Sequence, residues 1–274
     1  MYYLCNMTRE QLIESIRAKK SFLCVGLDTD PTQIPEHLRG KPDAVFTFNK
    51  AIIDATLDCC VAYKINTAFY EAMGVQGWEA MQQTVEYIPY THFTIADAKR
   101  GDIGNTSSQY ARAFFEGMNF DAITVAPYMG EDSIRPFLEY KDKWTIVLGL
   151  TSNKGAADFE MQPMASGMHL YEQVISTVSH WGTPGNLMFV AGATQASELA
   201  TIRAIIPDHF LLVPGVGFQG GSLSEVCEFG LNKDTGLLVN ASRAIIYAGE
   251  KENFAEEARI IAQQYQYEMA EYIK

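Results

Sequence analysis

Short apolar runs with the composition of β-strands recur along the chain, separated by segments in which apolar residues have helical spacing. After the third run, for example, Tyr110 is followed by Ala113 and Phe114. This alternation indicates parallel strands joined by crossover helices, and strands that are apolar nearly throughout indicate a sheet covered by helices on one side and filled on the other. The eight runs occupy residues 22–27, 61–65, 92–97, 122–126, 144–150, 187–192, 210–215 and 237–241.

Eight strand and helix units are the number that closes an α/β barrel. The rival topology is an open doubly wound sheet, in which a GxGxxG turn directly follows the first strand. Here the first run is followed by Asp28, Thr29, Asp30 and Pro31 instead. We therefore expect an α/β protein with a (β/α)₈ TIM barrel.

Helices are expected before and after the eight units. Thr8 and Gln11 have the spacing of a capping box, so a helix precedes the first strand. A similar cap at Asn253 and Glu256 begins a closing helix. No linker or low-complexity tract interrupts the repeat, and 274 residues are a common length for one barrel. We expect residues 1–274 to form a single domain.

The balance of charge argues against one class of partner. The chain has 21 Lys and Arg residues against 33 Asp and Glu residues, which is a formal net charge of −12. Such a chain repels the backbone of DNA or RNA, so we expect no nucleic-acid partner. An anionic small molecule also meets an unfavourable general field, so local cations and backbone N–H groups must hold it.

Cysteine and histidine usage points to a reduced compartment and to no metal site. The five cysteines, Cys5, Cys24, Cys59, Cys60 and Cys227, are odd in number and lack metal-ligand spacing. The five histidines show no paired ligand spacing either. No apolar run has the length of a signal peptide's core or of a membrane span. We therefore expect a cytoplasmic protein that binds neither a metal nor a membrane.

Polar residues follow several of the apolar runs, and in a barrel the C-terminal ends of the strands face the active site. Asp28 ends the first run, Lys64 lies near the end of the second, and Asp97 ends the third, with Lys99 and Asp102 just beyond it. A DxKxxD string alone is more often a solvated loop. Its place directly after an apolar strand, with polar groups at other strand ends, favours a cluster of alternating charges in one site.

A glycine-rich turn over residues 214–221 follows the seventh run, and Arg243 follows the eighth. Glycines let a backbone approach a ligand and present N–H groups, and a guanidinium binds two phosphate oxygens at once. Four glycines alone more often form only a flexible turn. Phosphate sites in barrels recur after strands seven and eight, so position and Arg243 together predict a phosphate site.

Taken together, these strings resemble those of the orotidine 5′-phosphate decarboxylase family, especially its longer-chain (type 2) branch. DxKxxD is shared with related sugar-phosphate barrels, but the combined set is highly specific and runs through nearly the whole chain in the expected order. The resemblance implies cofactor-free conversion of orotidine 5′-phosphate to UMP and CO₂ in pyrimidine biosynthesis, by a homodimer with shared active sites. The matching strings are VGLD (25–28), AYKIN with AFYE (62–71), DAKRGDIGNTS (97–107), PGVGFQGG (214–221) and NASRAIIYA (240–248).

The family's pattern implies catalytic roles for positions that match it. Lys64, Asp97, Lys99 and Asp102 would form an alternating charged network, in which Lys99 donates a proton to C6 of the pyrimidine. Asp102 and Thr106 would come from the neighbouring subunit.

The same pattern implies residues that bind the substrate. Asp28 and Lys64 would hold the ribose hydroxyls, and Ser152 the pyrimidine edge, with the adjacent Thr151 as an alternative. Gln219 and Arg243 would bind the phosphate. The full set of substrate-binding positions is Asp28, Thr106, Ser152, Pro214, Gln219, Gly220 and Arg243.

Two other interpretations stay open at this point. A Mg²⁺-dependent 3-keto-gulonate-phosphate decarboxylase or hexulose-phosphate synthase resembles the chain in DxKxxD but not in the remaining strings. A catalytically silent barrel that binds a nucleotide would typically lack the lysine or an aspartate of the network, whereas Lys64, Asp97, Lys99 and Asp102 are all present.

Overall fold

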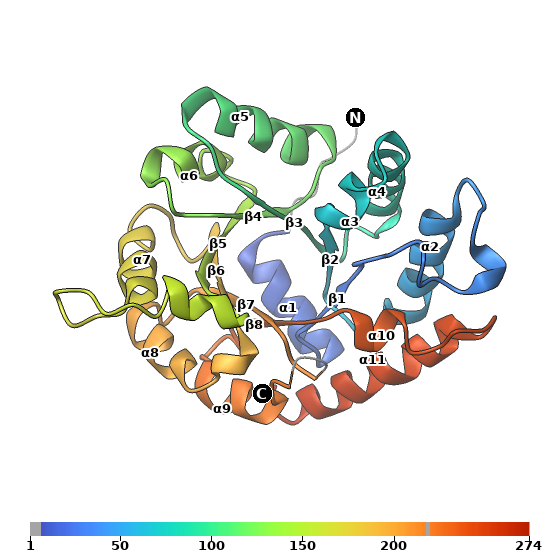
Figure 1. Ribbon diagram of the computed structural model, residues 1–274. Helices are drawn as coiled ribbons and strands as arrows, with labels where there is room; N and C mark the ends of the chain where they lie inside the picture. Colours follow the sequence, from blue (N-terminus) through green and yellow to red (C-terminus); the bar gives the residue numbers. More distant parts are fainter. Residues whose placement is uncertain (1–6, 218–219, 274) are drawn as a thin grey trace.

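The computed structural model describes residues 7–217 and 220–273, and within them eight parallel strands form one closed barrel in chain order. All eight predicted runs form strands, so the predicted (β/α)₈ fold is confirmed. Figure 1 looks onto the C-terminal ends of the strands. The strands are β1 Leu23–Gly26, β2 Ala62–Asn66, β3 Phe93–Arg100, β4 Ala122–Val125, β5 Trp144–Leu150, β6 Leu187–Ala191, β7 Phe210–Pro214 and β8 Leu237–Ala241.

Helices surround the barrel and cover the outer face of its sheet (Figure 1). Within the described ranges none of them is long and apolar enough to cross a membrane. The α-helices are α1 Arg9–Lys19, α2 Ala44–Thr56, α3 Thr67–Glu71, α4 Val75–Tyr87, α5 Gly104–Arg112, α6 Glu131–Leu138, α7 Leu170–Val178, α8 Glu198–Ile205, α9 Leu223–Gly230, α10 Arg243–Ile246 and α11 Phe254–Ala270. Shorter turns are the 3₁₀ segments η1 Glu36–Leu38, η3 Lys154–Asp158 and η4 Ala193–Gln195, and the π-helical turn η2 Ala113–Gly117.

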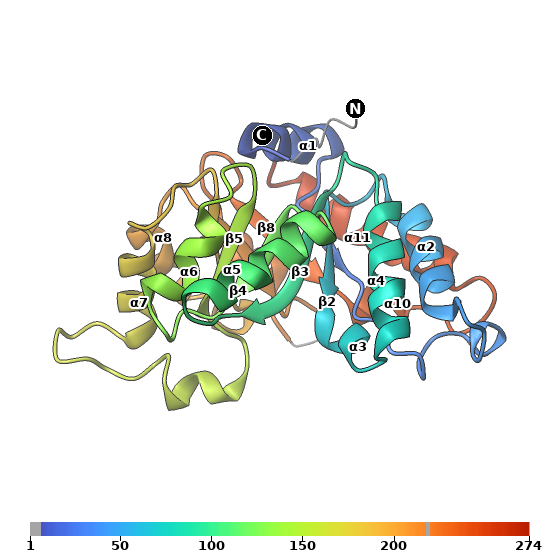
Figure 2. The ribbon, with the colours of Figure 1, turned by 90° about the horizontal axis from the view of Figure 1, so that it is seen from above.

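Aromatic side chains close the N-terminal end of the barrel. Phe93, Trp144 and Phe210 begin the alternate strands β3, β5 and β7, and they are fully buried. Their rings meet edge to face, with centroids 5.8 Å apart for Phe93 and Trp144 and 6.4 Å apart for Trp144 and Phe210. Helix α1 lies across this end (Figure 2), and the Arg9 guanidinium lies 5.0 Å from the Phe210 ring. The opening of the barrel is therefore at the opposite, C-terminal end of the strands.

The two predicted helix caps have different outcomes. The capping box of α1 is confirmed, because Thr8 Oγ1 accepts from the Gln11 amide at 3.3 Å and the Thr8 amide donates to Gln11 Oε1 at 2.8 Å. The predicted Asn253 and Glu256 cap of α11 is wrong. Asn253 is the N-cap residue, but its ψ of 15° is not the extended conformation that aims a capping side chain at the first turn. Its Nδ2 instead donates to Glu257 Oε1 at 3.0 Å.

Candidate active site

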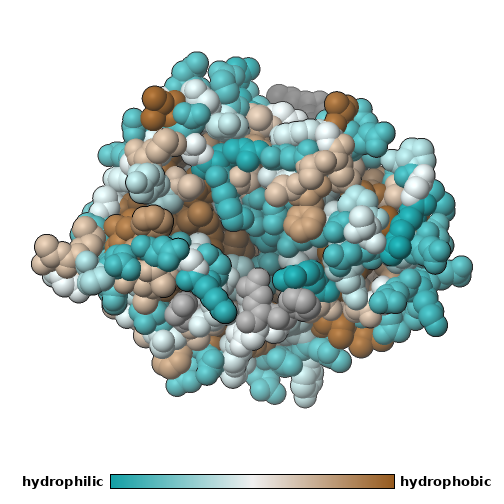
Figure 3. All heavy atoms as spheres, viewed as in Figure 1, coloured by the Kyte–Doolittle hydropathy of each residue, from teal (hydrophilic) through white to brown (hydrophobic). Residues whose placement is uncertain are grey.

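A cavity of about 180 Å³ lies where the C-terminal ends of β1, β2, β3, β7 and β8 converge. Figure 3 shows a hollow in the middle of this face, bordered by hydrophilic side chains above it and by more apolar ones to its left. Five of the residues that line the cavity were predicted from the sequence: Asp28, Lys64, Asp97, Pro214 and Arg243. A larger groove of about 820 Å³ lies outside the barrel along α2 and α4, away from the strand ends. The smaller cavity is therefore the candidate active site, because the predicted polar and charged residues line it.

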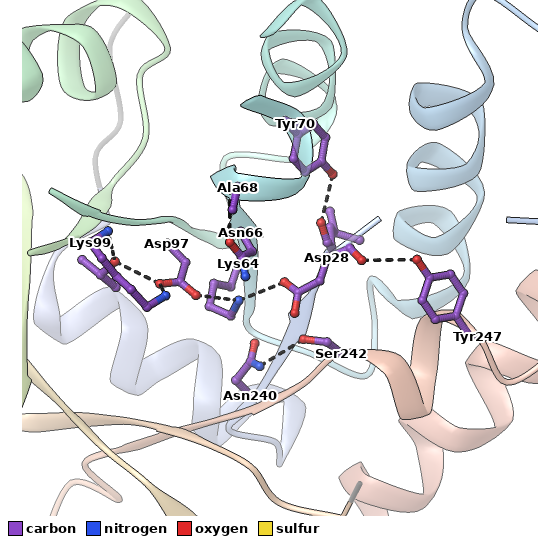
Figure 4. A network of polar contacts seen from close by, with 12 residues as sticks. Asp28, Lys64, Asn66, Ala68, Tyr70, Asp97, Lys99, Asn240, Ser242 and Tyr247 are labelled. Carbon is purple, nitrogen blue, oxygen red and sulfur yellow. Dashed lines mark hydrogen bonds and ion pairs between the residues drawn. The ribbon is translucent and has the colours of Figure 1, made fainter. Parts of the chain in front are cut away.

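Four charged side chains of alternating sign form a row at this cavity (Figure 4). Lys64 Nζ donates to Asp28 Oδ1 at 3.0 Å and to Asp97 Oδ2 at 3.1 Å. Lys99 Nζ donates to the other oxygen of Asp97, Oδ1, at 2.6 Å. The Lys64 side chain is only 4% exposed, whereas that of Lys99 is 50% exposed. The structure thus brings together four of the predicted residues and leaves the Lys99 ammonium facing open space.

The backbone of β3 is irregular where it carries Lys99. The register between β3 and β4 shifts between Ala96 and Arg100, and Lys99 has a left-handed φ of 47°. The Lys99 amide donates to Thr124 Oγ1 at 2.9 Å, and that hydroxyl donates to Asp97 Oδ1 at 3.0 Å. Bulges and strained non-glycine residues are common at functional sites because they redirect side chains. Thr124 therefore holds both the backbone of Lys99 and the carboxylate that its ammonium contacts.

Opposing effects set the charges of the buried pair. Burial lowers the pKa of Lys64, but the Asp28 and Asp97 carboxylates outweigh it and hold the pKa of this ammonium above its ordinary value. Burial raises the pKa of Asp97, but the Lys64 and Lys99 ammonium groups outweigh it and hold the pKa of this carboxyl well below its usual range. Both groups are therefore ionised at neutral pH.

Two tyrosine hydroxyls fix the backbone around Asp28. Tyr70 donates to the carbonyl of Leu27 at 3.0 Å, and Tyr247 donates to the carbonyl of Asp28 at 3.2 Å. Sequence reasoning assigned no role to these tyrosines or to Thr124. In the sequence Thr124 stands out as a hydroxyl within an apolar strand, and the two tyrosines lie within the strings AFYE and NASRAIIYA.

Asp102 and Thr106 do not join the charged row within this chain. The Asp102 carboxylate accepts from the amide of Ile103 at 2.7 Å, and within the described ranges it forms no ion pair. Thr106 is exposed in the first turn of α5, next to Asp102.

The loop after β5 carries Thr151 and Ser152, the two candidates for contact with the pyrimidine edge. The Thr151 hydroxyl, which has a single proton to donate, lies 2.9 Å from Glu160 Oε1 and 2.6 Å from Asn153 Oδ1. Thr194 Oγ1 donates to the carbonyl of Ser152 at 3.0 Å, which ties this loop to η4. The Thr151 hydroxyl is therefore engaged by acidic and amide oxygens of its own loop.

The predicted phosphate residues are only partly described. Pro214 and Arg243 line the cavity, whereas Gln219 lies outside the described residues. Gly220 is exposed and has a left-handed φ of 89°, but its amide donates to the carbonyl of Gly217 at 2.8 Å. The loop therefore uses some of its own N–H groups, and Arg243 lines the same cavity as Pro214.

The chain resembles named proteins over nearly its full length. Residues 21–258 match the family model described as orotidine 5′-phosphate decarboxylase / HUMPS family. An orotidine 5′-phosphate decarboxylase of Bacteroides fragilis is 56% identical over 271 residues, which are 98% of this chain and 99% of that protein.

Solved structures show the same likeness. A putative orotidine-monophosphate decarboxylase of Toxoplasma gondii has a TM-score of 0.87 and 32% identity, covering 99% of this chain and 100% of that one. The UMP synthase of Leishmania donovani has a TM-score of 0.83 and 38% identity over 95% of this chain, which spans 57% of that longer protein. On the family match, the identity and the barrel together, the chain belongs to the orotidine 5′-phosphate decarboxylase / HUMPS family.

Proposed function

We propose that the row of charges formed by Asp28, Lys64, Asp97 and Lys99 decarboxylates orotidine 5′-phosphate to UMP and CO₂. The reaction is a carboxy-lyase step of pyrimidine biosynthesis, and the family match and the 56% identical relative of equal length support it. The observation that carries the residue assignment is the Lys99 ammonium, held 2.6 Å from Asp97 at the open end of the barrel. The Mg²⁺-dependent sugar-phosphate reactions are not favoured, because the similarity to orotidine 5′-phosphate decarboxylases extends along the whole chain.

Lys99 supplies a cation where negative charge develops. When the bond between C6 and the carboxylate breaks, its electron pair stays on C6 and CO₂ leaves. An ammonium beside C6 therefore interacts more strongly with the transition state than with the substrate, which is the condition for acceleration. A proton then moves from Lys99 Nζ to C6, which gives UMP and leaves a neutral amine.

Asp97 has two tasks in this scheme. Its carboxylate holds Lys99 at 2.6 Å and Lys64 at 3.1 Å, so it fixes the position and charge of the proton donor. A substrate carboxylate bound beside Lys99 also lies near Asp97, and the repulsion between the two ends as CO₂ departs.

The remaining predicted residues, in the cavity and around it, bind the nucleotide from its sugar to its phosphate. Asp28 and Lys64 bind the ribose hydroxyls, and Arg243 with Gln219 binds the phosphate, with Pro214 and Gly220 beside it. Ser152 meets the pyrimidine edge. The phosphate is remote from the bond that breaks, so its binding energy serves to position the base and exclude water.

The active site is completed by a second subunit. Asp102 lies a few residues beyond Lys99 but makes no ion pair with the row of its own chain among the residues described. A carboxylate and a hydroxyl, from Asp102 and Thr106, are thus available to a neighbouring site across a two-fold axis. We propose a homodimer in which each site receives both residues from its partner.

Turnover by metal-free protein tests the reaction most simply. Protein treated with EDTA is mixed with orotidine 5′-phosphate, and the loss of substrate absorbance is followed. We expect full activity, since we propose neither a metal nor a cofactor. Absence of orotidine 5′-phosphate turnover, together with Mg²⁺-dependent turnover of a sugar phosphate, would favour the sugar-phosphate enzymes, and nucleotide binding without any turnover would indicate a silent barrel.

Two further proposals concern the number of domains and the cellular compartment. We propose that residues 1–274 form one domain and that the protein works in the cytoplasm. The buried, unpaired thiols of Cys24, Cys59, Cys60 and Cys227 support a reduced compartment, and limited proteolysis that yields no stable fragment would support the single domain.

A further inference from the structure

Asn240 is a buried amide in the wall of the active-site cavity. It lies in β8, is 7% exposed, and lines the cavity together with Asp28 and Lys64. Its Nδ2 donates to Ser242 Oγ at 3.2 Å (Figure 4), but its Oδ1 has no hydrogen-bond partner among the described residues. Leaving a buried acceptor unpaired destabilises a fold, and an apolar side chain at this position would avoid that cost. The unpaired oxygen therefore needs a donor that the described residues do not provide.

We propose that Asn240 is a further substrate-binding residue whose amide oxygen accepts a hydrogen bond from a ribose hydroxyl of the nucleotide. The inference rests on the proposed function, because it takes the occupant of the cavity to be a nucleotide. Asn240 would add a neutral hydrogen-bond acceptor to the charged Asp28 and Lys64 at the ribose.

Of the three parts of the substrate, the ribose is the one that can donate a hydrogen bond to Asn240 Oδ1. In the proposed binding mode the ribose lies at Asp28 and Lys64 and the phosphate at Pro214 and Arg243, and all four residues line the cavity. A phosphate dianion only accepts hydrogen bonds, so it cannot satisfy Oδ1. The pyrimidine N3–H is a donor, but the proposed contact for that edge, Ser152, does not line this cavity. The ribose hydroxyls are the remaining donors.

Lys64 provides the complementary half of the contact. Within the described residues its ammonium donates to Asp28 and Asp97, and an ammonium carries three N–H donors. The third can be donated to the oxygen of a ribose hydroxyl, which then donates its own proton to Asn240 Oδ1. A deoxy sugar lacks this hydroxyl and leaves both groups unpaired, so Asn240 would help the site to select its sugar.

Nucleotides that lack one hydroxyl test the proposal. Dissociation constants of UMP, 2′-deoxy-UMP and 3′-deoxy-UMP are compared for wild-type protein and Asn240→Leu. We expect Asn240→Leu to bind UMP about tenfold more weakly, and to lose about the same factor of discrimination against one of the two deoxynucleotides. The matched control is Thr145→Val, because Thr145 in β5 is also buried with an unpartnered hydroxyl among the described residues but does not line the cavity. This control should keep wild-type ratios.

Unchanged ratios for both deoxynucleotides in a folded Asn240→Leu protein would overturn the role of Asn240, even if wild-type protein decarboxylates orotidine 5′-phosphate. Absence of that turnover in wild-type protein would instead reject the proposed reaction. Should Asn240→Leu fail to fold, a crystal structure of wild-type protein with UMP decides. A ribose hydroxyl within about 3.5 Å of the Asn240 amide oxygen is expected, and a separation beyond about 4.5 Å contradicts the proposal.

Discussion

Lys99 Nζ lies 2.6 Å from Asp97 Oδ1, although the Lys99 side chain is half exposed and that of Asp97 is only 12% exposed. The buried carboxylate thus anchors the ammonium of a half-exposed side chain. Its second oxygen is 3.1 Å from the buried Lys64, so one carboxylate orders both cations. Because the pKa of Asp97 is held well below its usual range, this arrangement persists at and well below neutral pH.

The anchoring role of Asp97 predicts the effect of Asp97→Asn. The substitution keeps the shape but removes the charge that both lysines share, so we expect kcat to fall about a hundredfold or more while UMP still binds. The matched control is Asp54→Asn, which breaks an exposed pair with Lys50 on α2 and should leave kcat unchanged. Steady-state kinetics on both variants checks this, and equal kcat values for the two would show that Asp97 is not part of the catalytic machinery.

The phosphate role of Arg243 predicts a difference between two substrates. Arg243→Ala should lower kcat/KM about a hundredfold or more for orotidine 5′-phosphate, and much less for orotidine, which has no phosphate for the guanidinium to hold. Arg259→Ala removes a guanidinium that pairs with Asp58 outside the cavity, and it should affect neither substrate. A loss of the same factor on both substrates would mean that Arg243 is structural.

The shared site predicts the activity of a mixed dimer. Lys99→Ala and Asp102→Ala subunits, each inactive alone, are co-expressed with different tags and the heterodimer is purified. One of its sites then carries both lesions and the other carries neither, so about half of wild-type activity per dimer should return. If Asp102 instead acted within its own chain, each site would carry one lesion and the heterodimer would be as inactive as its parents.

Buried histidines predict acid sensitivity. Burial and the nearby cations Arg9 and Arg203 lower the pKa of His209 to about 4, and neither of its ring nitrogens has a partner among the described residues. Between pH 6.5 and 4 the unfolded chain therefore binds more protons at this site than the folded chain, and the free energy of unfolding falls as pH falls.

Between pH 7 and pH 5 the free energy of unfolding should fall by roughly 2 kcal/mol less in His209→Phe than in wild type. Urea unfolding at both pH values measures the difference. His180→Phe is the control, since His180 is on the surface. Parallel losses in all three proteins would show that His209 is protonated in the folded state at pH 5.

The barrel could be predicted because each unit repeats one local pattern. The apolar runs 144–150 and 237–241 form strands with the predicted ends, and polar residues at strand ends identified Asp28, Lys64 and Asp97. These features depend only on the order of residues along one strand and on the rule that strand ends meet at one face.

What the sequence did not reveal depends on contacts between distant segments. Thr124 reaches Asp97 and the amide of Lys99 only because β3 shifts register beside β4. The unpaired oxygen of Asn240 becomes visible only once neighbouring strands surround it. The Asn253 cap failed because its backbone conformation, which spacing cannot report, turns the side chain toward Glu257.

The turnover of Lys99→Ala tests the assignment of the proton donor most directly. We expect kcat for orotidine 5′-phosphate to fall about a thousandfold or more, because the missing ammonium acts on charge that appears only in the transition state, while UMP binding stays largely intact. Lys50→Ala, which removes a surface ammonium paired with Asp54, serves as the control and should turn over like wild type. Near-native kcat in a folded Lys99→Ala protein would contradict the role of Lys99 as the cation and proton donor at C6.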